Sequence, residues 1–252
     1  MNGSFLDRNS STPLHVQLAE RLRQLIISGE YQPGDRLSPE KELVDRFGLS
    51  RVTVRHGLEL LVREGWILKR QGLGTFVCNP IEQDLTSVQT TSEVARSKGI
   101  VTQARLLSFG TVVPPKHVAN ALGCRPDQML LRIEKLHSDE VSPIALTRGF
   151  LPMEFQLEAE IMRAQPDLPM IVIWERKLGV RIKVAQHHFR AEPADAETAQ
   201  SLDLRVDAPV LICDRIMYAD DGRAVEFIST FYRWNRYQFS ILLPRLSITD
   251  LR

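Results

Sequence analysis

The first eighty residues repeat one pattern three times: apolar residues at helical spacing, opened by serine or threonine and closed by glycine. This pattern predicts three amphipathic helices, over residues 12–29, 38–48 and 50–65. The predicted N-caps are Thr12, Ser38 and Ser50, and the predicted ends are Gly29, Gly48 and Gly65. Since only Leu49 lies between the second and third helices, this pair is predicted to form a helix-turn-helix.

The pattern then changes to the alternation that is typical of strands. Residues 66–70 and 75–77 predict two short strands, and the glycine-containing segment 71–74 predicts the turn between them. A hairpin in this position is a wing. We therefore expect a winged helix-turn-helix at the amino-terminal end of the chain.

The third predicted helix is basic at its start and apolar along its back. Its first turns carry Ser50, Arg51, Thr53 and Arg55, and the segment 46–58 contains no acidic residue. In a helix-turn-helix these turns enter the major groove, where arginine pairs with guanine and hydroxyl groups bind phosphate. The pattern favours double-stranded DNA as the partner. The alternative is a winged helix that binds another protein.

Beyond residue 92 the chain alternates between strand and helix patterns. Strands are predicted over 105–113, 129–137, 143–151, 181–191, 209–218 and 224–233, and helices over 115–122, 157–164, 169–178 and 194–202. The sequence DDGR at 220–223 predicts a hairpin turn. Together these elements predict an α+β domain with an antiparallel sheet.

One predicted strand, 129–137, suggests a binding pocket. Its odd-numbered positions share one face, which is apolar as far as Ile133 and then carries Lys135 and His137. An apolar face that ends in two donors favours a pocket for an anion. The alternative is a strand end that emerges into solvent.

Composition and charge indicate the general class of protein, but they do not identify a binding partner. The chain has 252 residues and a formal net charge of +1, so global charge does not indicate nucleic-acid binding. No apolar run is long enough to cross a membrane and the first residues do not resemble a secretory signal, so we expect a cytoplasmic protein without a membrane partner.

Cysteine and histidine patterns give no reason to expect a metal or a cofactor. Cys78, Cys124 and Cys213 are far apart and odd in number, which indicates neither a disulfide framework nor a zinc site. The adjacent His187 and His188 would point to opposite faces of a strand. Because no GxSxG, HExxH, P-loop or GxGxxG motif is present, no catalytic residue is predicted.

The amino-terminal stretch resembles a known family of bacterial regulators. PLHVQLAERLRQLIISGEYQPGDRLSPEKEL, FGLSRVTVR and REGWILKRQGLGTFV look like the winged helix-turn-helix of GntR-family transcription regulators, over roughly residues 12–78. Position by position, the resemblance implies DNA contacts from Lys41, Ser50, Arg51, Thr53, Arg55, Gln71 and Gly72.

Three positions depart from the usual family pattern. Ser38 and Pro39 stand in exchanged order, so we expect the second helix to begin one residue early and to lack a capping box. Lys41 replaces arginine, which should shift any base reading toward phosphate contact. Gly57 stands where alanine is usual, at a cost of about 0.5 to 1 kcal/mol unless close packing requires it.

The larger part of the chain resembles the UTRA effector domain of the HutC subfamily, whose fold is similar to chorismate lyase. The resemblance is carried by LLRIEKLHSDEVSPIALTRGFLP, LGVRIKVAQHHFRAEPADAETAQSLDL and DDGRAVEFISTFYRWNRYQF. We expect a winged domain over 8–78, a linker over 79–92 and a UTRA domain over 93–246. The resemblance implies dimerisation and an effector pocket that contains Thr91, Ser92, Lys135, His137, Thr147, Glu226 and Tyr232.

The pocket residues differ from the usual family residues in offering fewer hydrogen-bond donors. Members often show Arg-x-Arg where this chain has Lys135 and His137, and a glutamate where it has Thr147. A hydroxyl-rich helix start is replaced by Pro169, Met170 and Ile171. Fewer donors favour a small or apolar carboxylate over a sugar phosphate.

The predicted function is therefore a homodimeric DNA-binding transcriptional regulator, expected to be a repressor. It should bind an inverted-repeat operator, and a small anionic effector should alter that binding. The alternatives are a chorismate lyase-like enzyme domain fused to a DNA-binding module, or a winged protein-interaction module.

Overall fold

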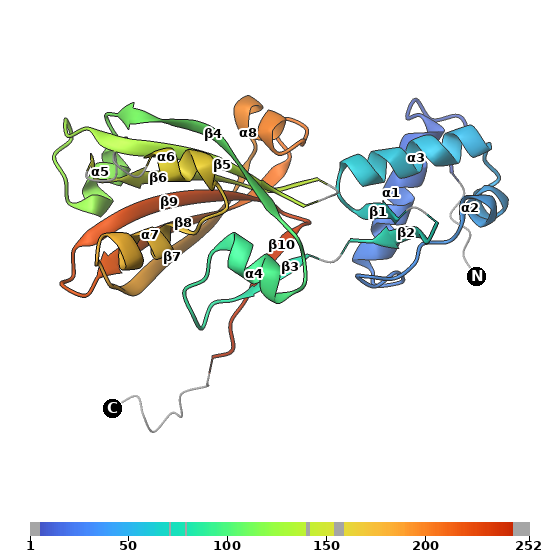
Figure 1. Ribbon diagram of the computed structural model, residues 1–252. Coiled ribbons are helices and arrows are strands. Elements are labelled where there is room, and N and C mark those ends of the chain that lie inside the picture. Colours follow the sequence, from blue (N-terminus) through green and yellow to red (C-terminus); the bar gives the residue numbers. More distant parts are fainter. Residues whose placement is uncertain (1–5, 71, 79, 140–141, 154–158, 244–252) are drawn as a thin grey trace, which may run out of the picture.

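The computed structural model describes residues 6–70, 72–78, 80–139, 142–153 and 159–243. Figure 1 shows two lobes: a small helical lobe built from the amino-terminal residues, and a larger lobe around a long, twisted sheet. The α+β fold class predicted from the sequence is confirmed.

The small lobe packs three helices around one apolar core. They are α1 (Leu14–Ile27), α2 (Glu40–Phe47) and α3 (Arg51–Arg63), and leucines from all three fill the core. Ser50 caps α3 as predicted, since its side chain accepts a hydrogen bond from the Thr53 backbone. Two predicted caps are wrong: α1 and α2 follow Pro13 and Pro39, without a side-chain cap from Thr12 or Ser38.

Proline explains both differences at the helix starts. Pro13 and Pro39 have φ values of −56° and −54° with extended ψ values of 142° and 151°, so the helical conformation begins only at the next residue. The second helix thus begins later than the sequence predicted, and the absence of a capping box there is confirmed.

Gly57 has a packing role in the middle of α3. A Cβ atom at this position would lie 3.0 Å from both the His15 carbonyl and a Leu18 methyl group. The glycine lets α3 approach α1 closely, and this contact offsets its helix-propensity cost.

The wing follows α3 directly. Strands β1 (Ile67–Arg70) and β2 (Gly74–Val77) pair antiparallel, as predicted. Gly72 lies in the turn with a φ of +73°, a conformation that glycine adopts without strain.

The larger lobe contains a six-stranded antiparallel sheet in the order β4-β5-β6-β9-β8-β7. Its strands are β4 (Gln103–Val112), β5 (Leu130–Ser138), β6 (Pro143–Leu151), β7 (Ile182–Pro193), β8 (Pro209–Ala219) and β9 (Ala224–Arg233). Each corresponds to a strand predicted from the alternation of apolar and polar residues.

Helices cover both faces of this sheet. The helices are α4 (Thr91–Ser97), α5 (Lys116–Leu122), α6 (Ala159–Ala164), α7 (Met170–Lys177) and α8 (Ala196–Ser201). Core clusters join α5 and α8 to one face, and join α4, α6 and α7 to the other. Since side chains alternate along each strand, the second face is the one that carries Lys135 and His137.

The range 79–92, expected to be a pattern-poor linker, contains secondary structure. Strand β3 (Ile81–Asp84) pairs parallel with β10 (Tyr237–Ser240), and α4 begins at Thr91. Ile81 and Tyr237 are buried in a core cluster with α4. The carboxyl-terminal part of the sheet domain thus holds the segment that leaves the small lobe. Within the ranges that the structure describes, no helix is long and apolar enough to span a membrane.

Candidate functional site

The start of α3 presents its donors to solvent. Ser50, Arg51 and Arg55 are exposed, and Thr53 is half-buried. The Ser50 hydroxyl lies 3.1 Å from the Thr53 backbone nitrogen and 2.8 Å from the Thr53 hydroxyl, which fixes the first turn. A rigid, exposed and acid-free first turn has the geometry that groove reading requires.

Three further DNA contacts were predicted outside α3. Lys41 on α2 and Gly72 in the wing are exposed, whereas Gln71 lies outside the described residues. Val52, which was not predicted as a contact, is 53% exposed between Arg51 and Thr53. An exposed valine on a groove-reading turn suits contact with a thymine methyl group.

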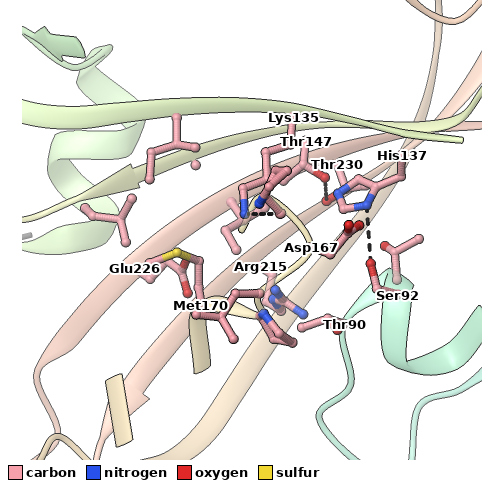
Figure 2. A pocket seen from close by; sticks show the side chains of 18 of the residues that line it. Thr90, Ser92, Lys135, His137, Thr147, Asp167, Met170, Arg215, Glu226 and Thr230 are labelled. Atoms are coloured by element: carbon pink, nitrogen blue, oxygen red, sulfur yellow. Dashed lines mark hydrogen bonds between the residues drawn. The ribbon is translucent and has the colours of Figure 1, made fainter. Parts of the chain in front are cut away.

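Every residue predicted for the effector pocket lines one cavity in the larger lobe (Figure 2). They are Thr91, Ser92, Lys135, His137, Thr147, Glu226 and Tyr232. The cavity lies between the sheet, the start of α4 and the segment that leads into α7, and its empty volume including the mouth is about 660 Å³. Its lining combines apolar side chains with a few polar groups, as is typical of sites for small molecules.

Strand register arranges the floor of this cavity in rows. The rows are His137–Ala145–Tyr232–Leu211, then Lys135–Thr147–Thr230–Cys213, then Ile133–Gly149–Ile228–Arg215, and then the pairs Leu131–Leu151 and Glu226–Met217. Successive rows are about 7 Å apart, since they are two residues apart along each strand. Away from α4 the floor is therefore apolar on β5 and β6, toward Leu131 and Leu151, while Arg215 on β8 and Glu226 on β9 keep the other side polar.

Burial weakens the cationic character of Lys135 and His137 to different degrees. The Lys135 Nζ atom donates to the Pro166 carbonyl at 2.7 Å, and burial lowers the pKa of Lys135 to about 8. Burial, with the nearby Lys135 charge, lowers the pKa of His137 to about 4, so this ring is neutral near pH 7. Its Nδ1 atom lies 3.5 Å from the Ser92 hydroxyl.

The opposite end of the cavity contains a buried acid. Burial raises the pKa of Glu226 to about 7. The charge of Arg215, a hydrogen bond from Trp174 and the charge of Lys135 oppose this shift. Near neutral pH the Glu226 carboxyl therefore exchanges a proton readily.

Helix α4 contacts the sheet through a pair of hydroxyl groups. The Thr91 hydroxyl lies 3.2 Å from the Tyr232 hydroxyl, and burial raises the pKa of Tyr232 to about 12. The start of α4 is thus attached to β9 inside the cavity.

Several lining residues were not found from the sequence. Arg215, Asp167, Thr90 and Thr230 also line the cavity. Thr230 shares the alternating face of β9 with Glu226 and Tyr232, so period-two spacing would have identified it. Arg215 lies on β8, which held no predicted residue, and only the sheet pairing shows which face it shares. Thr90 and Asp167 lie outside the strands, and only the folded chain brings them to the site.

The end of β9 contacts the end of α3 across the two lobes. The Arg233 Nη2 atom donates to the Arg63 carbonyl at 3.2 Å, and the Asn235 Nδ2 atom donates to the Glu64 carbonyl at 2.6 Å. Carbonyls at the carboxyl end of a helix lack partners within the helix, so these donors cap α3. The cap comes from the strand that carries Glu226 and Tyr232.

This contact is close and buried. Arg233 is 0% exposed, and its Nη1 atom also donates to the Leu202 carbonyl at 3.1 Å. A Cβ atom at Gly65, whose φ is +76°, would lie 3.0 Å from the Arg233 Nη2 atom. The rings of Trp66 and Trp234 meet edge-on beside it, with centroids 4.8 Å apart.

The described residues contain no group of three or more histidine, cysteine, aspartate or glutamate side chains that could hold a metal ion. His187 makes a contact of 3.8 Å with the Cys213 sulfur, and His188 is exposed.

Comparisons with known proteins agree with this architecture. The family model for bacterial regulatory proteins of the gntR family matches residues 14–77, and the UTRA domain model matches residues 97–238. The HTH-type transcriptional regulator Rv0792c of Mycobacterium tuberculosis is 41% identical over 238 residues, which cover 93% of this chain and 87% of that protein. The HTH-type transcriptional repressor NagR of Bacillus subtilis is 31% identical, covering 96% of this chain and 99% of NagR.

A solved structure shows the same fold. PhnF from Mycobacterium smegmatis matches with a TM-score of 0.60 and 23% identity, over 90% of this chain and 98% of PhnF. Two family models that match in the predicted order, and relatives that match along almost the whole chain, identify both lobes. The chain belongs to the GntR family of bacterial regulatory proteins, as a DNA-binding transcriptional regulator whose larger, UTRA domain binds an effector.

Proposed function

We propose that this regulator is a homodimeric repressor that binds an inverted-repeat operator and responds to a small carboxylate or a similar anionic metabolite. The observation that carries the proposal is the strand β9, which lines the cavity with Glu226 and Tyr232 and also caps α3 through Arg233. The cavity and the DNA-reading helix are thus joined by one rigid element.

The proposed DNA contacts are residues of α2, α3 and the wing segment that the family resemblance implies. They are Lys41, Ser50, Arg51, Thr53, Arg55, Gln71 and Gly72. Arginine supplies bidentate base reading, while lysine, the hydroxyl groups and the wing backbone bind phosphate. Two copies of the head in a dimer would read the two halves of a symmetric site.

The proposed effector contacts are Thr91, Ser92, Lys135, His137, Thr147, Glu226 and Tyr232. The floor of the cavity supports a small, partly apolar ligand, because on the β5–β6 side its polar rows give way to Ile133, Gly149 and Leu151. A sugar phosphate would need hydrogen-bond groups along its whole length, and this side of the cavity offers few beyond Lys135 and Thr147.

Effector control requires a coupling free energy between the cavity and the DNA-reading helix. Coupling between distant sites is typically about 1 to 3 kcal/mol. A ligand that shifts β9 by a fraction of a residue would move the cap on α3, and with it the angle between the two lobes. The Thr91–Tyr232 contact gives helix α4 a part in the same movement.

Each proposed domain has its own role. Residues 8–78 read DNA, 79–92 connect the lobes, and 93–246 bind the effector and the second copy of the chain. In this proposal the protein is not an enzyme and acts in the cytoplasm, beside the DNA that it regulates. The relatives with the widest coverage are named as regulators, which supports this reading over the lyase-like alternative.

The test is selection of binding sites from random duplex DNA with the full chain. A two-fold symmetric site, bound with affinity that falls steeply as salt rises, supports the proposal. Binding that is independent of salt, or that selects no sequence, contradicts it. A parallel selection with a single aromatic or aliphatic carboxylate present shows whether the ligand changes site affinity.

A further inference from the structure

Arg215 faces the cavity from β8, and its guanidinium has hydrogen-bonding capacity that the protein does not use. Its Nη1 atom donates to the Gln89 carbonyl at 3.1 Å, whereas its buried Nε atom has no hydrogen-bond partner among the described residues. No ion pair joins Arg215 to a carboxylate within the described part of the chain. The Arg215 charge acts on the Glu226 carboxyl, whose pKa burial raises to about 7, so near neutral pH this carboxyl only partly offsets the half-buried guanidinium and leaves it able to pair with a further anion.

The neighbours of Arg215 define the shape of a ligand that could reach it. In the sheet, Arg215 pairs with Ile228, which lies in the same row as Gly149. A Cβ atom at Gly149 would make only ordinary contacts, the nearest at 3.9 Å. The glycine is therefore not required by the backbone, and it leaves room above the middle of the sheet, two strands away from Arg215 in the same row.

The other basic groups of the cavity are weaker candidates for an anion. Lys135 already donates to the Pro166 carbonyl, and its pKa is lowered by burial. The His137 ring is neutral near pH 7 because burial lowers its pKa to about 4. Arginine keeps its charge in such surroundings, and its planar fork matches a carboxylate or phosphate in two parallel hydrogen bonds.

We propose that Arg215 binds the anionic group of the effector, and that the apolar body of the ligand lies over Gly149 toward Leu151. This inference rests on the proposed function, and it adds a specificity-determining residue that the family resemblance did not supply. The ligand class is then a monocarboxylate with an aliphatic or aromatic body.

The same residue connects the ligand to helix α4. Gln89 immediately precedes Thr90, which caps α4 in a capping box with Glu93. The Gln89 carbonyl also accepts a hydrogen bond from the Gln83 side chain on β3, at 3.3 Å. An anion on Arg215 therefore acts directly beside the segment that joins β3 to α4.

The experiment measures binding of defined anions to the full chain. Acetate, hexanoate, benzoate, succinate, inorganic phosphate and glucose 6-phosphate are screened by thermal unfolding, and the Kd of each stabilising anion is then titrated. The variants are Arg215→Gln, Arg215→Lys and Gly149→Val. Arg181→Ala, which removes an exposed arginine next to β7, is the control for charge.

We expect a carboxylate to bind the wild type and Arg181→Ala alike. Loss of charge-assisted hydrogen bonds in Arg215→Gln should raise its Kd roughly 10- to 100-fold. Arg215→Lys, which keeps the charge without the fork, should give an intermediate Kd, and it serves as the test if Arg215→Gln does not fold. Gly149→Val should block binding, because its methyl groups enter the space above the sheet.

The outcomes separate this inference from the proposed function. An anion that Gly149→Val excludes but both Arg215 variants bind normally overturns the role of Arg215 and leaves the pocket intact. An anion that still binds Gly149→Val, or a panel with no binder, overturns the proposed effector site and class. Tighter binding of glucose 6-phosphate than of any carboxylate overturns the monocarboxylate class.

Discussion

At the scale of single residues, the start of α3 depends on one hydroxyl group and two cations. Ser50 holds the first turn, while Arg51 and Arg55 project from it into solvent. Arg55 lies 4.0 Å from Glu59, a contact between exposed side chains that contributes little to stability and leaves the guanidinium available.

Replacing Arg51 by alanine should weaken binding to the selected DNA without affecting the fold. If Arg51 contacts a base, discrimination at that base pair should fall by about 1 to 3 kcal/mol. If it binds phosphate, the slope of log K for DNA binding against log salt concentration should decrease in size by about one. Anisotropy titrations across a salt series measure both. Arg125→Ala, an exposed change in the larger lobe, is the control, and equal losses in the two variants would contradict the assignment.

Glu226 should make the stability of the protein depend on pH. Its pKa is raised from an ordinary 4.5 to about 7, so the folded state keeps a proton that the unfolded state has lost. This group therefore lowers stability as the pH rises from about 4.5 to 7, by on the order of 3 kcal/mol in total. Arg215, Trp174 and Lys135 are the groups that oppose the shift.

Glu226→Gln removes this dependence and tests its sign. The variant should gain stability relative to the wild type as the pH rises through that window, and the difference should level off above it. Comparison with the wild type cancels His137 and His187, whose lowered pKa values near 4 give the opposite slope. Denaturant unfolding from pH 4.5 to 8 measures the difference, and a constant offset would contradict the shift.

The pocket residues were predicted in two ways, from strand alternation and from the family resemblance. Lys135 and His137 followed from period-two spacing, and their resemblance to family positions named the rest. Their charge states did not follow, since the lowered pKa of His137 arises from burial that only the folded sheet creates. Arg215 was not predicted, because nothing in the sequence near it indicates that its side chain lies on the cavity face of the sheet.

At the scale of elements, β9 has two functions along one strand. Alternate residues line the cavity, and the residues just beyond Tyr232 cap the end of α3. The sequence predicted β9 and α3 but not their contact, because two partners that lie 170 residues apart leave no local pattern. The pairing of β3 with β10 was missed for a similar reason.

Replacing Gly65 by alanine should loosen the junction between the lobes. Left-handed backbone costs a non-glycine residue about 1 to 2 kcal/mol, and the new Cβ would press against the fully buried Arg233. Gly99→Ala is a matched control, since Gly99 has a φ of +71° with nothing within 4 Å of a Cβ atom.

Thermal unfolding of both glycine variants isolates the contact between the lobes. Gly65→Ala should lose more stability than Gly99→Ala, and only Gly65→Ala should reduce the effect of a bound anion on DNA affinity. Equal losses of stability in both variants would contradict a tight contact between Arg233 and α3.

At the scale of the whole molecule, two lobes with separate cores must act together. The leucines around α3 fill one core, and four further clusters pack around the large sheet. The order of these parts was predictable from the change in periodicity near residue 66 and from the family resemblance. The angle between them was not, because it depends on a few hydrogen bonds at the junction.

Dimerisation should be independent of DNA. We expect sedimentation of the DNA-free protein to give twice the mass of the 28.7 kDa chain. Removing residues 1–78 should leave the dimer intact if the larger domain holds the two copies together. A monomer at micromolar concentration would contradict the proposed symmetric reading of DNA.

The most direct measurement is the affinity of the full chain for its selected duplex, with and without a saturating carboxylate that binds the wild type. A coupled cavity and helix predict a shift of about 5- to 150-fold in the wild type. They predict none in Gly149→Val, whose cavity is filled. Identical affinities in the wild type with and without the ligand, or the same shift in Gly149→Val, would show that the sheet cavity does not control DNA binding.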